Sequence, residues 1–475
     1  MNAVRTMDEL PGPRALPLLG NGATLLTGES HVHAVERWAA RYGPLFRYSI
    51  GPQQFVAITD EGAIREVLRA RPTTYRRTRI VEDVLGELNI TGLFAAEGDN
   101  WHRQRRLIMP AFKPAHIRKS GEVVGRATRR LISVWGRAAA AGDAIDVARD
   151  FKRFTVDVTT ALTFDVDMNT VEQGSHALQS KLEKVFPGLE RRLNFPVPYW
   201  RLFKTKVDVD MESSVVELRS KMGSIIADAR ERLRADPELR AQPSTILEAL
   251  IVENLADAHA EGFSDDDVFS NMLTLLLAGE DTTAYMMAWM VHYMNRYPGV
   301  QDRARSEAQR VLGGADLLED VGRVRELPYL LAVAQEVLRV RSSTPLLLFQ
   351  PNEPVELMGV RLEPDTSITL CTRLLANRPE SFSEPDRFLP ERWIDGLRPP
   401  GYTHRPRVSV PFGDGPRICP GRSLAFVEAQ VLLSAVLKAF EFSAVPGAPP
   451  VTEQAEFVVC PKGVQTHLRA RTHVE

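Results

Sequence analysis

One cysteine in this sequence stands among glycines, directly ahead of an apolar segment. The run Phe412-Gly-Asp-Gly-Pro-Arg-Ile-Cys-Pro-Gly421 contains Cys419, with Arg417 two residues before it, and a helix is expected from about residue 424. Glycines let bare backbone approach a flat or anionic group. A helix N-terminus and a nearby arginine both favour the thiolate form of a cysteine. The pattern therefore indicates a metal ligand or a nucleophile.

The surroundings of Cys419 favour the ligand without excluding the nucleophile. No histidine that could act as its base stands nearby in the sequence, although a residue distant in sequence could still be close in space. The other cysteines, Cys371 and Cys460, form no C-x-x-C pair, so neither a zinc ribbon nor a disulfide framework is supported. A lone thiolate suits heme iron. A buried structural cysteine is the remaining alternative.

A second polar group interrupts the most apolar part of the sequence. The run Ala278-Gly-Glu-Asp-Thr-Thr283 places two acids and two hydroxyls inside the apolar stretch 272–291. Burying such groups costs free energy unless they are paired or take part in function. Gly279 is expected to leave room for a ligand, and Thr282 can bond back to a helix carbonyl. A solvated helix face is the alternative.

Two further charged patterns stand on expected helices. Glu336 and Arg339 are three residues apart on one helix face, and Arg392 follows some 50 residues later. Trp101 and Arg105 share a helix face at the i, i+4 spacing, where an indole and a guanidinium can hold a carboxylate. Taken alone, each pattern is also compatible with ordinary surface charges.

Together these motifs resemble the cytochrome P450 superfamily, in the form of a bacterial-type soluble member. The cysteine loop has the family's Phe-x-x-Gly-x-Arg-x-Cys-x-Gly form at Phe412, Gly415, Arg417, Cys419 and Gly421, and the motifs occur in family order over nearly the whole chain. The resemblance implies a mainly helical fold with small β-sheets. It also implies that a long central helix and the cysteine loop enclose heme b (iron protoporphyrin IX).

The resemblance assigns roles to individual residues. It implies that Cys419 is the iron ligand and that Asp281 and Thr282 deliver protons during oxygen activation. A buried structural network behind the heme would contain Glu336, Arg339 and Arg392. The residues expected to hold the cofactor are Trp101, Arg105, Ala278, Phe412, Arg417, Cys419 and Gly421.

One position departs from the family pattern, and the expected pocket is apolar. Gln350 stands where many members have an arginine that binds a heme propionate, so the propionate geometry is in doubt. A hydrophobic small-molecule substrate is expected from the residues that would line the pocket: 78–100, 186–203, Leu275, Ala278, 344–348 and Phe457.

Helical patterns dominate the elements that must position these residues. Ser264 and the acids after it predict a helix start, and the pattern continues without proline to Tyr297, or roughly 50 Å. No linker-like stretch divides the 475 residues, so one domain is expected over residues 1–475, with a flexible lead-in over 1–10. Short strands are expected at 45–49, 55–59, 355–360 and 367–371.

Composition limits the partners and the location. A net charge of −2 offers no general attraction to nucleic acid or to anionic membranes. Met1 to Leu10 has no signal-peptide core, and acids interrupt the one apolar stretch of near-spanning length, so a cytoplasmic protein without a membrane anchor is expected. Only 54 residues follow Gly421. Electrons are therefore expected from an external ferredoxin or flavodoxin with its NAD(P)H reductase.

The expected reaction is a monooxygenation that inserts one atom of O2 into the substrate. A peroxide-using or rearranging heme-thiolate enzyme and a non-catalytic heme-binding protein are the alternatives. Retention of Asp281 and Thr282 argues against both. Peroxide-supported turnover that outruns partner-supported turnover would favour the first alternative. Consumption of NAD(P)H without any oxygenated product across a wide substrate panel would favour the second.

Overall fold

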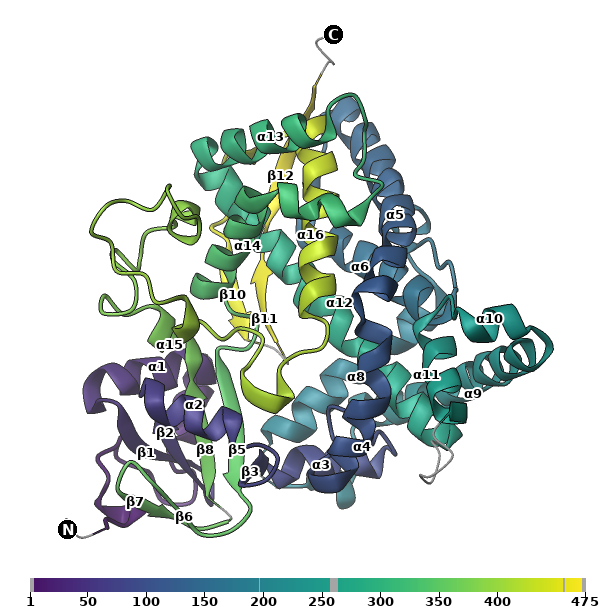
Figure 1. The fold of residues 1–475 in the computed structure, drawn as a ribbon. Helices are drawn as coiled ribbons and strands as arrows, with labels where there is room; N and C mark the ends of the chain where they lie inside the picture. The colour runs from purple at the N-terminus through teal and green to yellow at the C-terminus, as the bar shows by residue number, and fades with distance from the viewer. Residues whose placement is uncertain (1–3, 196, 257–263, 365, 456–457, 472–475) are drawn as a thin grey trace.

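Helices dominate the molecule, and the strands gather into small sheets (Figure 1). The computed structural model describes residues 4–195, 197–256, 264–364, 366–455 and 458–471. The α-helices are α1 (His31–Tyr42), α2 (Glu61–Arg69), α3 (Arg79–Glu87), α4 (Gly98–Ile108), α5 (Pro114–Ala141), α6 (Val147–Phe164), α7 (Thr170–Gln173), α8 (Ala177–Asn194), α9 (Lys206–Ala235), α10 (Pro237–Ala241), α11 (Ile246–Ala256), α12 (Asp265–Arg296), α13 (Pro298–Leu312), α14 (Pro328–Val340), α15 (Thr372–Ala376) and α16 (Arg422–Ala439).

The largest sheet has the strand order β1-β2-β8-β5-β3, and its β2–β8 pairing is parallel while the others are antiparallel. It lies at the lower left of Figure 1, beside α1 and α2. This sheet joins the first part of the chain to the segment that follows α14. The strands are β1 (Leu45–Ile50), β2 (Gln53–Ile58), β3 (Tyr75–Arg77), β4 (Ala144–Asp146), β5 (Leu346–Pro351), β6 (Val355–Leu357), β7 (Val360–Leu362), β8 (Ser367–Cys371), β9 (Phe440–Ala444), β10 (Thr452–Ala455), β11 (Val459–Lys462) and β12 (Gln465–Ala470).

One predicted strand differs from the sequence-based expectation. The predicted strand 355–360 is divided into β6 and β7, because Met358 and Gly359 adopt positive φ values of 53° and 71° and form a turn. The described part of the lead-in, residues 4–10, contacts the fold, and its flexibility stays a prediction. The Arg5 N–H donates to the Gly359 carbonyl at 3.0 Å, and Leu10 is buried.

The long central helix predicted from the sequence is α12, which passes through the middle of the helical part of the molecule (Figure 1). Ser264 caps its start. The Ser264 hydroxyl accepts from the Asp267 N–H at 3.1 Å, and the Asp267 carboxylate accepts from the Ser264 N–H at 3.1 Å. The helix ends before Tyr297 and Pro298, so its expected limits are confirmed. Most of its side chains are buried, which is typical of a helix inside a core.

Helix α6 packs along α12 at the polar interruption. A Cβ added at Gly279 would lie 3.2 Å from the Thr159 Oγ1 and 3.3 Å from the Thr159 Cγ2. The prediction that Gly279 leaves room for a ligand is therefore wrong, because α6 occupies that space. The Thr155 hydroxyl of α6 also donates to the Glu280 carbonyl of α12 at 3.0 Å. The polar interruption of α12 is thus partly satisfied by α6.

The cysteine loop packs on α2 before it enters α16. Gly415 has a φ of 72°, which side-chain-bearing residues rarely adopt. A Cβ at Gly415 would lie 2.8 Å from both the Leu68 carbonyl oxygen and the Arg69 Cα. Glycine is therefore required here by the close approach of two backbones.

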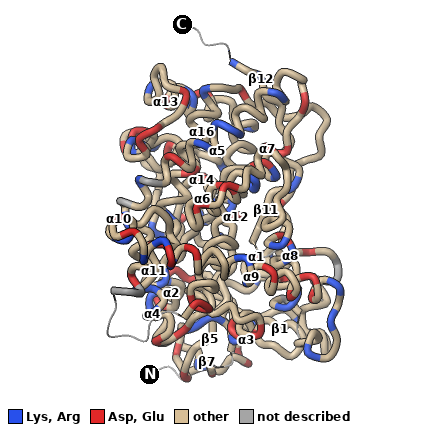
Figure 2. Tube along the Cα trace, turned by 90° about the vertical axis from the view of Figure 1, so that its right-hand side faces the viewer, with Lys and Arg blue, Asp and Glu red and all other residues tan. Residues whose placement is uncertain are grey.

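Acidic and basic residues are distributed over the whole molecule (Figure 2). Figure 2 shows acidic and basic residues interspersed along the chain, so the net charge of −2 is not separated into large acidic and basic halves. Within the described ranges, no helix combines the length and the apolar character needed to cross a bilayer.

Candidate active site

The Cys419 thiol lies at the start of α16. The Cys419 N–H donates to the Phe412 carbonyl at 2.9 Å and closes the loop. Burial raises the pKa of the Cys419 thiol, and hydrogen bonds from the Gly421 and Arg422 backbone, with the charge of Arg105, oppose this only in part. Desolvation thus opposes the preference for the thiolate that the sequence suggests, and that preference stays a prediction for the cofactor-bound protein. A metal cation would reverse this, since a coordinated thiol loses its proton.

Cys419 and the face of α12 around Ala278 both retain solvent-accessible surface. Cys419 retains accessible surface although burial dominates its pKa, which means that the thiol faces an interior space. Ala278 is exposed in the middle of the mostly buried α12, and Leu275 and Thr282, three and four residues away on the same helix face, are partly buried. This small, largely apolar face can admit a flat group, and a thiolate is a ligand that heme iron takes.

Three arginines gather around one carboxylate near this loop. Glu97 Oε2 lies 2.5 Å from Arg417 Nη1, and Glu97 Oε1 lies 3.7 Å from Arg71 Nη2 and accepts from the Arg77 N–H at 3.1 Å. Arg71 is 5% exposed, and its Nε and Nη2 have no hydrogen-bond partner among the described residues.

The charge balance of this cluster is incomplete. Burial, together with the neighbouring guanidinium charges, lowers the pKa of Arg71 to about 8 and that of Arg77 to about 9. Three positive charges stand against the single negative charge of Glu97, and buried charges are costly unless they are paired. The residues present therefore fit a further anion, and the propionates of heme have the required charge and hydrogen-bond acceptors.

Trp101 and Arg105 of α4 lie next to the cluster. The guanidinium of Arg417 lies 5.1 Å from the centre of the Trp101 ring, and Arg417 Nη2 also donates to the Ala96 carbonyl at 2.8 Å. Arg105 is partly buried, and its charge acts on both Arg417 and Cys419. The structure thus brings together three of the residues that were expected to hold the cofactor: Trp101, Arg105 and Arg417.

The strand that carries Gln350 explains why Arg71 and Arg77 were missed in the sequence. Gln350 Oε1 accepts from the Arg79 N–H at 2.9 Å, and the adjacent Phe349 ring packs 4.1 Å from the Arg71 guanidinium. Arg77 ends β3, which pairs with β5, and it lies opposite Phe349, the neighbour of Gln350. The proximity depends on strand pairing between distant segments, and no motif spacing gives a signal for it.

Glu336 on α14 is the centre of a fully buried network. Arg339 donates to both Glu336 oxygens at 2.9 Å, and Arg392 Nε donates to Glu336 Oε1 at 3.0 Å. Trp393 Nε1 donates to Glu336 Oε2 at 2.8 Å. All three charged side chains are 0% exposed, which excludes a surface ion pair. The arginines also donate to backbone carbonyls, so the network holds the irregular segment after α15 against α14.

The acid pair of α12 points toward α6. Lys152 Nζ lies 2.8 Å from Asp281 Oδ1 and 3.9 Å from Glu280 Oε1. Burial and the Asp281 charge raise the pKa of Glu280 to about 8, and Lys152 opposes the shift. Thr282 Oγ1 donates instead to the Ala278 carbonyl at 2.7 Å, as the sequence predicted. Both acids are buried, so a solvated helix face is excluded.

Lys152 was missed in the sequence because it stands 129 positions before Asp281, on another helix. The only local signal was that two buried acids require a counter-charge. That signal predicts a cation without saying which one.

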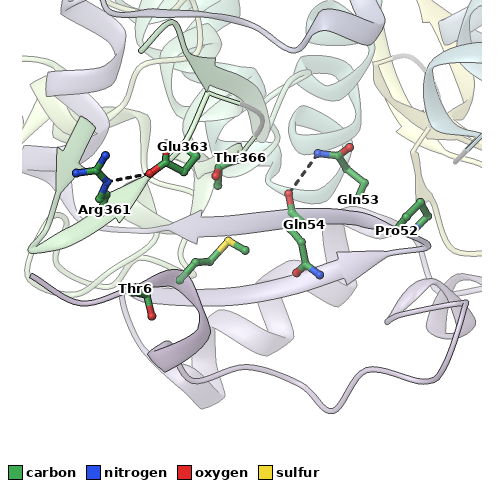
Figure 3. A pocket seen from close by; sticks show the side chains of 8 residues that line it. Thr6, Pro52, Gln53, Gln54, Arg361, Glu363 and Thr366 are labelled. Atoms are coloured by element: carbon green, nitrogen blue, oxygen red, sulfur yellow. Dashed lines mark hydrogen bonds and ion pairs between the residues drawn. The ribbon is translucent and has the colours of Figure 1, made fainter. Parts of the chain in front are cut away.

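A surface pocket of about 450 Å³ lies elsewhere in the molecule (Figure 3). Its two charged residues, Arg361 and Glu363, pair with each other at 2.8 Å. No residue of the cysteine loop or of α12 lines it, so it is not part of this site. It is lined by Thr6, Met7, Pro52, Gln53, Gln54, Arg361, Glu363 and Thr366.

A helical fold with a long central helix, a lone-cysteine loop and a buried Glu-Arg-Arg network has the features of a heme-thiolate protein. Residues 10–468 match the family described as Cytochrome P450. The chain therefore belongs to the cytochrome P450 family, whose cofactor is heme (iron protoporphyrin IX).

The similar proteins come from fungi, plants and animals. The chain is 27% identical to the self-sufficient cytochrome P450 monooxygenase CYP505E4 of Penicillium camemberti, over 93% of this chain and 41% of that protein. It is 28% identical to the mitochondrial 25-hydroxyvitamin D-1 alpha hydroxylase of Homo sapiens, over 97% of this chain and 92% of that protein. It is 26% identical to the chloroplastic protein LUTEIN DEFICIENT 5 of Arabidopsis thaliana, over 86% and 69%. The chain thus spans 41% of the length of the self-sufficient relative.

Proposed function

We propose that this chain is a heme-dependent monooxygenase that inserts one atom of O2 into a hydrophobic small molecule. The cysteine loop carries the proposal. Its one thiol retains accessible surface at the end of a glycine-rich loop, and a thiolate is a ligand that heme iron takes. Membership of the cytochrome P450 family and the hydroxylase and monooxygenase names of its relatives support the same reaction class.

The cofactor would be held from several elements at once. We assign iron ligation to Cys419, with Phe412 and Gly421 shaping the loop around it and Ala278 leaving room on α12. When bound, heme supplies the iron centre at which O2 is activated. The propionates would be held by the guanidinium groups and the indole of Trp101, Arg105 and Arg417, together with Arg71 and Arg77.

Proton handling is assigned to Asp281 and Thr282. The Thr282 hydroxyl shares a helix face with Ala278, which places a proton donor on the side where the cofactor is expected. Asp281 is the adjacent acid that would replenish this hydroxyl. Its present partner is Lys152, so Asp281 must change partner to do so.

The substrate class follows from the apolar side chains near the expected cofactor. Leu275 and Phe94 are partly buried. Leu346 and Leu348 of β5, which were also expected in the pocket wall, pack against the cluster that contains Trp38 and Tyr48. Side chains of this kind bind apolar surface and offer few hydrogen bonds. Phe457, also expected in the pocket wall, lies outside the described residues.

We propose that electrons come from a separate acidic protein. A cleft of about 400 Å³ reaches Phe412 and Ile418 of the cysteine loop. Four arginines line this cleft, against the one acid Asp414, and they are Arg65, Arg69, Arg407 and Arg422. An arginine-rich cleft favours an acidic partner such as a ferredoxin or flavodoxin, itself reduced by an NAD(P)H reductase.

Three finer statements stay predictions: a bacterial-type soluble subtype, a cytoplasmic location, and a single domain over residues 1–475. The family match over residues 10–468 supports the single domain. The names of two relatives place them in mitochondria and chloroplasts, so location should be measured by fractionating cells that express the chain.

The experiment that tests the function is the absorbance difference spectrum of the dithionite-reduced protein with carbon monoxide. A strongly red-shifted Soret band that is lost in Cys419→Ala supports thiolate ligation. Substrate screening with a ferredoxin system then tests oxygenation. Folded protein supplied with heme that gives no heme band contradicts the proposal.

A further inference from the structure

Lys152 is the one cation within ion-pair distance of both acids of α12 among the described residues. Its side chain is 29% exposed, whereas those of Glu280 and Asp281 are 4% and 11% exposed. Lys152 Nζ lies 2.8 Å from Asp281 Oδ1, and no other described group hydrogen-bonds to this oxygen, so Lys152 is its electrostatic support. Lys152 therefore extends from the surface to a buried pair of carboxyl groups.

We infer that Lys152 is a positioning residue that acts as the shared counter-ion of Glu280 and Asp281 and lets one proton move between them. The inference rests on the proposed monooxygenase function, because oxygen activation is the step that consumes such a proton.

The charge balance leads to this arrangement. If both acids were ionised, two negative charges would face one ammonium group in a buried site, so one acid keeps its proton. Lys152 is closer to Asp281 than to Glu280, at 2.8 Å against 3.9 Å, so Glu280 is the acid whose ionisation is less well compensated. The other titratable groups that act here are Glu183 of α8, which disfavours ionisation of Glu280, and Tyr285, whose ring lies 5.9 Å from Lys152 Nζ.

A shared counter-ion makes the transfer neutral in charge. When the carboxyl proton of Glu280 moves to Asp281, the negative charge moves in the opposite direction, and Lys152 is within reach of both positions. Asp281 then becomes the acid that can pass its proton to Thr282. Solvent at the exposed end of Lys152 restores the proton. During the transfer from Glu280 to Asp281, one carboxylate is paired with Lys152 before and after the step, which keeps the cost of that step low. Once Asp281 has passed its proton on, both acids are ionised, and the resulting excess negative charge favours the return of a proton to Glu280 from solvent.

Infrared titration of the heme-loaded protein tests this without turnover. Glu280→Gln should remove a protonated-carboxyl band that disappears in the wild type near pH 8, because the pKa of Glu280 is raised to about 8. Lys152→Met should move the titration upward by roughly one pH unit or more, since it removes the cation that favours ionisation. Lys152→Arg should restore it. If the Glu280→Gln variant and the Lys152→Met variant both titrate like the wild type, the inference is overturned.

Turnover gives the second readout. The ratio of oxygenated product to peroxide should fall about tenfold in Lys152→Met with KM unchanged. This is less than the roughly 10²–10⁴-fold effect of a group that itself transfers the proton, because Lys152 acts through the two acids. Lys181→Met is the matched control, because Lys181 is similarly exposed, at 26%, and pairs with one surface acid, Glu217, at 2.6 Å. An unchanged ratio in Lys152→Met overturns the role in proton delivery. A wild type that shows the infrared result but forms no product overturns the proposed function and leaves the counter-ion arrangement standing.

Discussion

Arg71 shows, at the scale of one residue, how a buried and incompletely paired charge can indicate an anion-binding site. Replacing Arg71 by Gln should stabilise the heme-free protein, because like charges no longer repel, and should weaken heme retention, because one propionate partner is lost. We expect heme loss to become about tenfold faster, which corresponds to about 1.4 kcal/mol and is typical of one hydrogen bond to a charged group. Transfer of heme to apomyoglobin measures the loss.

The control for Arg71 is Arg37→Gln, because Arg37 is 55% exposed and pairs with Glu29 at the surface. It should change neither heme loss nor the stability of the heme-free protein. If Arg71→Gln behaves like this control, the cluster around Glu97 is not a propionate site.

Glu428 on α16 gives a second residue-scale prediction. It is 3% exposed, its Oε2 has no hydrogen-bond partner among the described residues, and burial raises its pKa from 4.5 to about 8. Between these values the folded state holds a proton that the unfolded state has lost. The free energy of unfolding therefore falls as pH rises from about 5 to about 8.

Glu428→Gln should remove this dependence. The variant should be more stable than the wild type by about 4 kcal/mol at pH 8 and nearly equal to it at pH 4.5, since one pKa unit corresponds to about 1.4 kcal/mol. Denaturant unfolding of both proteins across this range measures the difference. A difference that stays constant with pH would show that Glu428 is not the titrating group.

At the scale of elements, Glu336 joins α14 to the segment that contains Arg392. Glu336→Gln should destabilise the fold by about 3–5 kcal/mol, because it leaves Arg339 and Arg392 buried without a counter-charge. Glu326→Gln is the matched control. Glu326 also pairs with an arginine three residues away, but Arg323 and Glu326 are 42% and 36% exposed, so the loss should stay below about 1 kcal/mol. Denaturant unfolding of the two variants compares them, and equal losses would contradict the structural role.

The sequence predicted elements well where the pattern is local. The limits of α12 follow from the Ser264 cap and from Pro298, and the cysteine loop follows from its glycines. The contacts that each element makes with its neighbours in space could be predicted from the sequence only in part. The space beside Gly279 is occupied by α6 and not by a ligand, and Asp281 pairs with Lys152, which also lies on α6. Both outcomes depend on the packing of α6 on α12, which no residue spacing encodes.

At the scale of the whole molecule, the site is assembled from segments far apart in the chain. The arginines around Glu97 come from three segments: Arg71 precedes β3, Arg77 lies in β3, and Arg417 lies in the loop before α16. Glu280 and Asp281 come from α12, and their counter-ion Lys152 comes from α6. The family resemblance identified the members that belong to contiguous motifs. Arg71, Arg77 and Lys152 belong to no motif, and each is visible only as a charge that the folded core must balance.

The arginine-lined cleft beside the cysteine loop gives the last prediction, because it concerns how the whole molecule meets a partner. Arg69 and Arg407 are exposed on its rim. Reversing both to Glu should slow reduction by an acidic ferredoxin about tenfold at low salt, and should flatten the salt dependence, since attraction between exposed charges is screened by salt. Stopped-flow reduction measures the rate, and dithionite reduction of the same variant should be unchanged.

The control reverses two exposed arginines away from the cleft, Arg37 and Arg361, which leaves the net charge of the two double variants equal. If both double variants slow reduction to the same extent, overall charge governs the encounter and the cleft is not the docking site. If only the Arg69 and Arg407 variant is slowed, electrons enter on the side of the cysteine loop. Cys419 would then lie between the donor protein and the face of α12 that carries Ala278 and Thr282, so electron entry and proton entry through Lys152 would use different surfaces of the molecule.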